Sequence, residues 1–408
     1  MRSWAITEST VTFLNGFDIA WLPDQAYSYV TPQLKHTKGN HVLVGLESGP
    51  FVGAIPLSNG DILRIGPQAG EKALWRMLLL SEGLAGQLEK EFESFIEISY
   101  TDAGIGSWMA LLARAYFEQL RLIEKSSLRS ERVLVKRRLV SARGRVQLIP
   151  TIISLEKHES LPVHARYRER TFQTLEHRVL GTAARRLHDI GFVEPGSKAI
   201  ALRWASHAAG RLKQTELRDV VAALRNRQYT GSRSYYIPAL LMARLLLVEA
   251  GISFDDEHTV SSEVLLTNIR TLFEKYVRGI LQKALYDKGF VVDKQQEHPR
   301  SLFEDGTCKL IPDVLVSDVG GVRLILDAKY KIDKEVTEGD YYQMTTYLNR
   351  FGISTGVLVF PSLSTTNGTL KTRRTVSGLM VHEIRLPIDN WKATEQFLTV
   401  EVQRLLGS

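Results

Sequence analysis

Two short apolar segments separated by a glycine pair constrain the fold of this chain more than any other feature. Residues 311–316 read Ile-Pro-Asp-Val-Leu-Val, and residues 322–330 read Val-Arg-Leu-Ile-Leu-Asp-Ala-Lys-Tyr. Apolar runs of this length joined through glycine are typical of a β-hairpin. Such a hairpin brings Asp313 to the same end as Asp327 and Lys329, which lie two residues apart and therefore leave one face of their strand.

The residue types at this end of the hairpin indicate metal-dependent phosphodiester chemistry. Asp313 and Asp327 offer the carboxylate oxygens that Mg²⁺ prefers, and Mg²⁺ keeps waters that phosphate oxygens can replace. Lys329 can orient an attacking water and offset the negative charge of the transition state. The alternative is an exposed ion pair between Asp327 and Lys329. Against it, both charges close an apolar run, where they are costly unless they serve a metal or a partner.

Helical patterns on both sides supply further candidates. In residues 268–281 the apolar residues recur at helical spacing, and Glu274 lies near the apolar face. The alternative for Glu274 is a surface ion pair with Arg278, four residues on. Downstream, residues 340–348 read as a helix that places Gln343 and Tyr347 on one face. For this pair the alternative is a packed tyrosine beside an amide.

Pro312, Asp313, Asp327 and Lys329 resemble the motif of the PD-(D/E)xK nuclease superfamily. The wider pattern is similar to McrC, the nuclease subunit of McrBC modification-dependent restriction systems. The resemblance extends over residues from about 40 to 350. One departure is Gln68, where the family commonly has a lysine that would contact a partner. The segments that carry the resemblance are 53–57, 61–67, 74–78, 143–146, 166–170, 272–277, 311–313, 324–330 and 342–344.

The resemblance to McrC implies a Mg²⁺-dependent endonuclease, with Mn²⁺ as an alternative metal, that cuts methylated double-stranded DNA. It also implies a McrB-like AAA+ GTPase partner, whose hydrolysis the amino-terminal region of this chain stimulates. Glu274 would be a further metal ligand, and Gln343 and Tyr347 would contact phosphate or support the lysine. The chain has no phosphate-cradling Gly-x-x-x-x-Gly-Lys loop, so the nucleotide-driven motor must be another polypeptide.

Composition agrees with a cytoplasmic DNA-binding protein. The net charge is +7, and basic residues gain affinity for DNA by releasing phosphate counterions. The single cysteine, Cys308, excludes a disulfide framework. No segment has the pattern of a signal peptide or the length of a membrane span. Basic residues gather in residues 129–145, which either contact nucleic acid or a partner or form a solvated strand face.

A chain of 408 residues is too long for one compact core. We therefore expect a multidomain α+β protein in three regions. Residues 1–128 would form a β-rich, partner-binding region that turns helical from Glu71, and residues 129–260 a basic, mainly helical region. Residues 261–408 would form a PD-(D/E)xK restriction-endonuclease-like α/β core with residues 356–361 as an inner strand.

Finer expectations concern the middle of the chain. Residues from about 165 to 260 read as mainly helical, most clearly at 171–187 and 236–250. The polar segment 251–262 would be the hinge before the nuclease core.

Two other functions fit the same residues. One is a non-cleaving adaptor that activates a separate AAA+ NTPase or bridges it to DNA, and the intact acidic pair and lysine argue against it. The other is a stand-alone DNA repair nuclease. The long amino-terminal region makes that function the less economical explanation.

Overall fold

The computed structural model describes most of the chain, which folds as two compact units. The first unit combines Met1–Leu111 with Ser262–Ser408, and the second contains Leu112–Leu247. The division into regions 1–128, 129–260 and 261–408 stays a prediction, and the expected hinge at 251–262 lies outside the described residues. Those are residues 2–36, 42–81, 108–208, 212–225, 229, 231–249, 265–294 and 300–407.

The amino-terminal part of the first unit is β-rich, as predicted. One sheet has the strand order β1-β6-β5-β10, and a second has the order β2-β4-β3. Strand β10 comes from much later in the chain and pairs antiparallel with β5, so the sheet is completed just before the carboxy-terminal elements begin. The strands are β1 (Ser3–Thr7), β2 (Val11–Leu14), β3 (Val30–His36), β4 (Val42–Ser48), β5 (Phe51–Pro56), β6 (Ile62–Gly66) and β10 (Leu265–Asn268), with 3-10 turns at Ile19–Trp21 and Asp24–Ser28.

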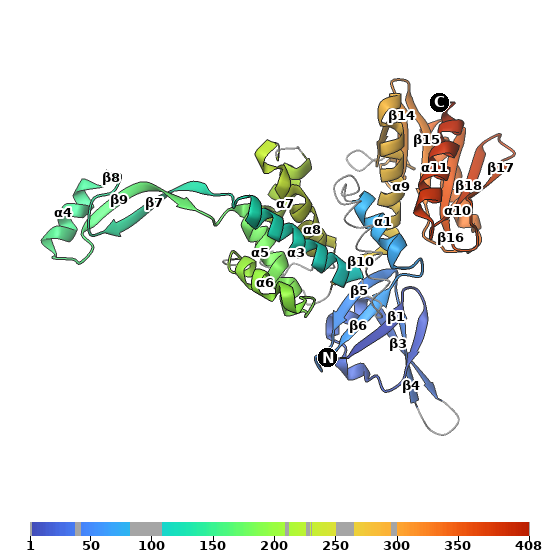
Figure 1. Cartoon of the computed structure of the whole chain (residues 1–408). Coiled ribbons are helices and arrows are strands. Elements are labelled where there is room, and N and C mark those ends of the chain that lie inside the picture. Colours follow the sequence, from blue (N-terminus) through green and yellow to red (C-terminus); the bar gives the residue numbers. More distant parts are fainter. Residues whose placement is uncertain are drawn as a thin grey trace. The chain divides into compact units, whose positions relative to one another are not determined.

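A mixed sheet of the order β11-β14-β15-β16-β18-β17 forms the centre of the carboxy-terminal part (Figure 1). Strands β14 and β15 are the predicted antiparallel hairpin, and Gly321, the first residue of β15 after the turn, has a positive φ of 112°. The expected inner strand is β16, which runs parallel to both β15 and β18. The strands are β11 (Val291–Asp293), β14 (Val314–Asp318), β15 (Gly321–Ala328), β16 (Thr355–Ser362), β17 (Thr369–Arg374) and β18 (Met380–Pro387), and β12 (Arg300–Ser301) pairs separately with β13 (Lys309–Leu310).

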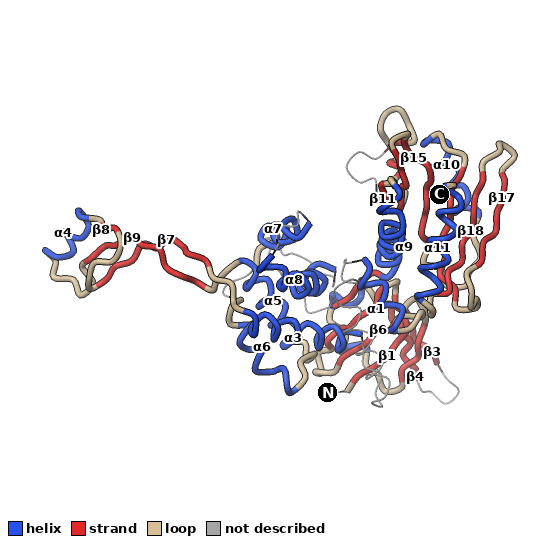
Figure 2. Tube along the Cα trace, turned by 45° about the horizontal axis from the view of Figure 1, so that its top comes forward, coloured by secondary structure: helices blue, strands red, loops and turns tan. Residues whose placement is uncertain are grey.

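Helices cover this sheet. Helix α10 (Glu338–Phe351) packs its apolar side against Ile325, Leu358 and Phe360. Helices α9 (Ile269–Leu285) and α11 (Trp391–Leu406) contact each other and pack on the sheet as well (Figures 1 and 2). Helix α10 begins at a capping box formed by Thr337 and Asp340, which satisfies the free N–H groups of its first turn.

Helix α1 (Glu71–Ser81) ties the amino-terminal part to the carboxy-terminal one. It packs on α9 where Gly279 lies against Leu80, and a Cβ at Gly279 would come within 3.2 Å of the Leu80 carbonyl oxygen. Arg76 of α1 forms a buried ion pair with Glu395 of α11 and stacks on Trp391, with 4.0 Å from the guanidinium carbon to the ring centroid. These contacts join elements from both ends of the chain in one unit.

The second unit has a helical body, as predicted, but part of the expected helix is a strand. Residues 163–171 form strand β9, which pairs with β7 (Glu131–Leu139), and helix α5 begins only at Leu175, after Thr174 caps it. In residues 166–170 more exposed and less exposed side chains alternate, which is the two-residue period of a strand. Pairing with β7 makes this segment a strand and not a helix. The helices are α3 (Trp108–Ser126), α5 (Leu175–Asp189), α6 (Lys198–Ala205), α7 (Gln214–Arg225) and α8 (Ile237–Arg244), which continues as a π-helical turn over Leu245–Glu249, and 3-10 turns lie at Pro195–Ser197 and Gly231–Tyr236.

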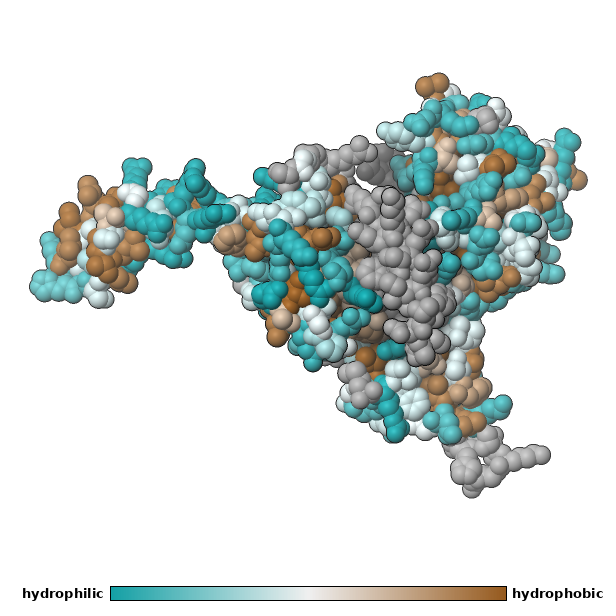
Figure 3. Space-filling model, in the orientation of Figure 1, coloured by the Kyte–Doolittle hydropathy of each residue, from teal (hydrophilic) through white to brown (hydrophobic). Residues whose placement is uncertain are grey.

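Strands β7 (Glu131–Leu139) and β9 (Val163–Thr171) form a long two-stranded arm that extends from this helical body (Figure 1). The basic segment 129–145 is therefore largely a solvated strand. At the end of the arm lie β8 (Arg145–Val146) and α4 (Leu148–Glu156). Helix α4 exposes large apolar side chains, with Ile149 76% exposed. Figure 3 shows this apolar surface at the end of the arm.

Candidate functional site

Asp313 and Asp327 meet at the end of the hairpin. Val314 pairs with Leu326 at the end of the ladder; Asp313 directly precedes Val314 and Asp327 directly follows Leu326. The main-chain N–H of Ala328 donates to Asp313 Oδ2 over 2.9 Å, which fixes that carboxylate. Both aspartates are buried, at 8% and 2% exposed for Asp313 and Asp327. The sequence prediction that they converge is confirmed by this geometry.

Lys329 stands beside Asp327 and is held by helix α10. Its ammonium lies 2.8 Å from Asp327 Oδ2 and donates to Gln343 Oε1 over 2.9 Å. The amide of Gln343 in turn donates to the Tyr347 hydroxyl over 2.7 Å. The predicted helical pair therefore lies against the lysine. Because Asp327 is almost fully buried, its ion pair with Lys329 is not the exposed surface pair that the sequence left as an alternative.

Glu274 of α9 is linked to Asp313 by Lys294, a residue that the sequence analysis missed. The ammonium of Lys294, just after β11, lies 2.9 Å from Glu274 Oε2 and 3.5 Å from Asp313 Oδ1. The hydrogen bond that the structure gives Arg278 goes to the main-chain oxygen of Asp313, over 3.1 Å, and not to Glu274. Only the pairing of β11 with β14 brings Lys294 here, and no local spacing signals it.

A second missed contact lies beside Lys329. The ammonium of Lys331 lies 2.9 and 2.7 Å from the two carboxylate oxygens of Asp340 in the first turn of α10. Asp340 also accepts from Thr337 as part of the helix cap. The contact fixes the loop after Lys329 to the start of the helix that carries Gln343. An Asp nine residues after a Lys gives no sequence signal for this pairing.

The carboxylates influence one another because they share a buried space. Burial, reinforced by Asp327 and Glu274, raises the pKa of Asp313 to about 7. Burial also raises the pKa of Asp327, against the opposing effect of Lys329. For Lys329, burial acts to lower the pKa, but the charge and hydrogen bond of Asp327 outweigh it and the pKa is raised. The lysine therefore stays charged at neutral pH, whereas the crowded carboxylates resist ionisation until a further cation offsets their charge.

The aspartates suit a divalent cation. Asp327 Oδ2 is buried and has no hydrogen-bond partner of normal geometry, although the Lys329 ammonium is close to it. A buried carboxylate oxygen left in this way is costly unless a cation satisfies it. Within the described residues, no three His, Cys, Asp or Glu side chains form a ready-made metal cluster. Mg²⁺ commonly binds proteins through one or two carboxylates and fills its other positions with water and phosphate.

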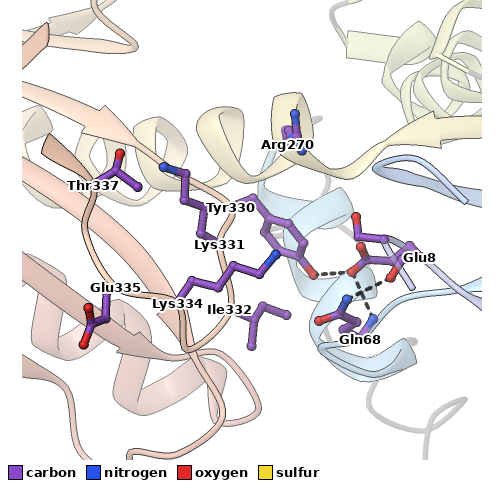
Figure 4. Close-up of a pocket in the computed structure, with 10 residues that line it drawn as sticks. Glu8, Gln68, Arg270, Tyr330, Lys331, Ile332, Lys334, Glu335 and Thr337 are labelled. Carbon is purple, nitrogen blue, oxygen red and sulfur yellow. Dashed lines mark hydrogen bonds between the residues drawn. The ribbon is translucent and has the colours of Figure 1, made fainter. Parts of the chain in front are cut away.

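A cavity of about 250 Å³ lies next to this site, on the side of the amino-terminal sheets (Figure 4). Tyr330, which follows Lys329, donates its hydroxyl to Glu8 Oε1 over 3.0 Å. Gln68 contacts the same residue: its main-chain N–H donates to Glu8 Oε1 and its side chain to the Glu8 carbonyl. Gln68 is the position where the sequence departs from the family pattern. Its two hydrogen bonds hold Glu8, which in turn connects the amino-terminal part to Tyr330.

A protein-family model described as a McrBC 5-methylcytosine restriction system component matches residues 46–361. The chain belongs to this family. The resemblance to McrC seen in the sequence is therefore confirmed. No curated protein matches the chain in sequence.

Two solved structures are similar to this McrBC family member. One is a half-complex from the tetradecameric assembly of Thermococcus gammatolerans McrB AAA+ hexamers with bound McrC, with a TM-score of 0.62 and 14% identity over 99% of this chain and 100% of the other. The other is a McrBC complex from the same organism, with a TM-score of 0.45 and 12% identity over 69% and 88%. The first shows that the mixed α/β fold is shared along the chain. None of the described helices is long and apolar enough to cross a membrane.

Proposed function

We propose that this chain is the Mg²⁺-dependent endonuclease subunit of a McrBC-type restriction complex that cuts methylated double-stranded DNA. The observation that carries the proposal is the pair of buried aspartates with a charged lysine, at adjoining strand ends of a mixed sheet. This arrangement supports a PD-(D/E)xK core. Family membership supports the restriction context.

Asp313 and Asp327 would hold Mg²⁺, or Mn²⁺ in its place, and Glu274 would support it as a third carboxylate. The bound ion would polarise the scissile phosphate and lower the pKa of a bound water. The chain itself supplies oxygen donors that are already fixed. Asp313 is held by the Ala328 N–H, and Asp327 is enclosed by the sheet.

Lys329 would act on the water and the phosphate. Its ammonium can orient the attacking water, whose oxygen forms the new P–O bond while the bond to the departing sugar oxygen breaks. The positive charge offsets the charge that grows on the phosphate oxygens. Gln343 and Tyr347 would keep the ammonium in place, because the hydrogen bonds from Lys329 to Gln343 and from Gln343 to Tyr347 leave it little freedom.

The partner would be a McrB-like AAA+ GTPase whose hydrolysis this chain stimulates. The similar solved chain comes from an assembly of McrB AAA+ hexamers with bound McrC. Residues 1–128 remain the proposed partner-binding region. The apolar end of the arm adds a second candidate surface, because exposed apolar groups such as Leu148 and Ile149 of α4 mark sites of protein contact.

Plasmid cleavage tests this function. Methylated and unmethylated plasmid are incubated with the chain, Mg²⁺ and either GTP or ATP, with and without a McrB-like AAA+ protein. We expect cutting only with partner, nucleotide and methylation. Cutting by the chain alone would instead identify a repair nuclease. Stimulated nucleotide hydrolysis without cutting, under any metal, would identify an adaptor.

A further inference from the structure

Lys294 places its ammonium between two of the carboxylates that the proposed metal site would use. Its Nζ lies 2.9 Å from Glu274 Oε2 and 3.5 Å from Asp313 Oδ1. Its side chain is 20% exposed, and the two carboxyl side chains are 22% and 11% exposed. The ammonium is thus withdrawn from most of the solvent and faces carboxylate oxygens. That is the kind of environment a bound cation requires.

We infer that Lys294 is a resident counter-ion that exchanges with the divalent metal: it neutralises the carboxylates of the metal-free protein and leaves them when the metal binds. The inference rests on the proposed function. It assigns a role to a residue outside the motif. It also makes metal binding a competition between the chain's own cation and the divalent ion.

Charge explains why the exchange is favoured over simple addition. Metal binding requires ionised carboxylates. In that state the carboxylates of Glu274, Asp313 and Asp327 and the ammonium groups of Lys294 and Lys329 sum to a charge of −1. Adding a divalent ion to all of them would give +1 in a space with little water. If the Lys294 ammonium departs, the sum is zero. Like charges crowded at low dielectric repel strongly, so the metal gains by displacing one ammonium.

The two lysines differ in how firmly they are held. Lys329 follows directly on the central strand β15, and its ammonium contacts both Asp327 and Gln343. Lys294 follows the short edge strand β11, and its ammonium contacts the carboxylates of Glu274 and Asp313. A lysine on a flexible four-carbon stem can move its charge by rotation alone. Lys294 is therefore the ammonium that leaves.

Mn²⁺ binding to the full-length chain, measured by calorimetry, tests the exchange without any cleavage assay. Lys294→Met keeps the apolar stem and removes the charge. We expect it to bind Mn²⁺ about tenfold more tightly than the wild type, which corresponds to about 1.4 kcal/mol. Lys288→Met, at an exposed position in the turn after α9, is the matched control and should bind as the wild type does. Asp327→Asn should abolish binding.

A second variant and a melting experiment keep the test valid if Lys294→Met folds poorly. Lys294→Gln should also tighten Mn²⁺ binding, and both variants should melt at a lower temperature than the wild type in EDTA, because the carboxylates lose their counter-ion. Saturating Mn²⁺ should remove that difference. If the wild type binds Mn²⁺ and both Lys294 variants bind it equally or more weakly, the exchange is wrong and the proposed function stands. If neither the wild type nor the variants bind Mn²⁺, the proposed function fails and the exchange fails with it.

Discussion

Replacing Gln343 with leucine tests how the active lysine is held. In the structure Gln343 accepts from the Lys329 ammonium over 2.9 Å and donates to the Tyr347 hydroxyl over 2.7 Å. Leucine has a similar size but makes neither bond. A hydrogen bond to a charged group contributes about 1.5–3 kcal/mol. If that energy is used to position the ammonium in the transition state, the cleavage rate should fall by about 10- to 150-fold.

The assay is single-turnover cleavage of methylated plasmid by the complete complex with saturating Mg²⁺. Tyr347→Phe should have a smaller effect, because it leaves the bond between Lys329 and Gln343 intact. Thr346→Val is the control on the same helix, since the Thr346 hydroxyl donates to the Tyr342 carbonyl and not to the site. A rate for the folded Gln343→Leu variant within about threefold of the wild type would refute the positioning role. So would an equal loss in the Thr346 control.

Three further predictions use other parts of the structure. Because burial raises the pKa of Asp313 to about 7, the native metal-free protein keeps a proton that the unfolded chain releases above about pH 4. The free energy of unfolding should therefore fall from about pH 4 to 7 in urea titrations. The Mn²⁺ affinity should rise about tenfold per pH unit up to pH 7, and an affinity that stops rising at pH 5 would contradict this. Glu395→Ala removes the carboxylate that pairs with the Arg76 side chain, which is 5% exposed, and should cost about 3–5 kcal/mol in urea unfolding, while a loss below about 1 kcal/mol would argue against a buried pair. Exchanging both Ile149 and Ile152 of α4 for aspartate should weaken binding of the AAA+ partner at least about tenfold in a pull-down titration, with an unchanged melting temperature, because the side chains are already exposed; undiminished binding would remove the arm from the partner surface.

The parts of the site that the sequence predicted depend on local spacing. The hairpin follows from two apolar runs and a glycine turn, and it places Asp313 beside Asp327 whatever the rest of the chain does. Gln343 and Tyr347 are four residues apart on one helix, so their common face was set by the helical period. The hydrogen bond from Lys329 to Gln343 needed only the packing of that helix on the sheet.

The parts that the sequence did not predict depend on pairing between distant segments. Lys294 lies in the site because β11, which directly precedes it, pairs with β14. Glu8 reaches Tyr330 because two strand systems from opposite ends of the chain meet. Residues from about 165 were predicted to be mainly helical, but residues up to Thr171 belong to strand β9, because they pair with β7. A one-dimensional pattern carries little information on such partners.

Cleavage by the Asp327→Ala variant tests the central claim most directly. The complete complex is assembled with either the wild-type or the variant chain, and cutting of methylated plasmid is measured with Mg²⁺ and GTP. Asp327 is 2% exposed and belongs to both the proposed metal site and the Lys329 ion pair. We predict that cutting is abolished while assembly with the partner and its nucleotide hydrolysis are retained. Cutting at the wild-type rate by the variant complex would contradict the assignment of this site.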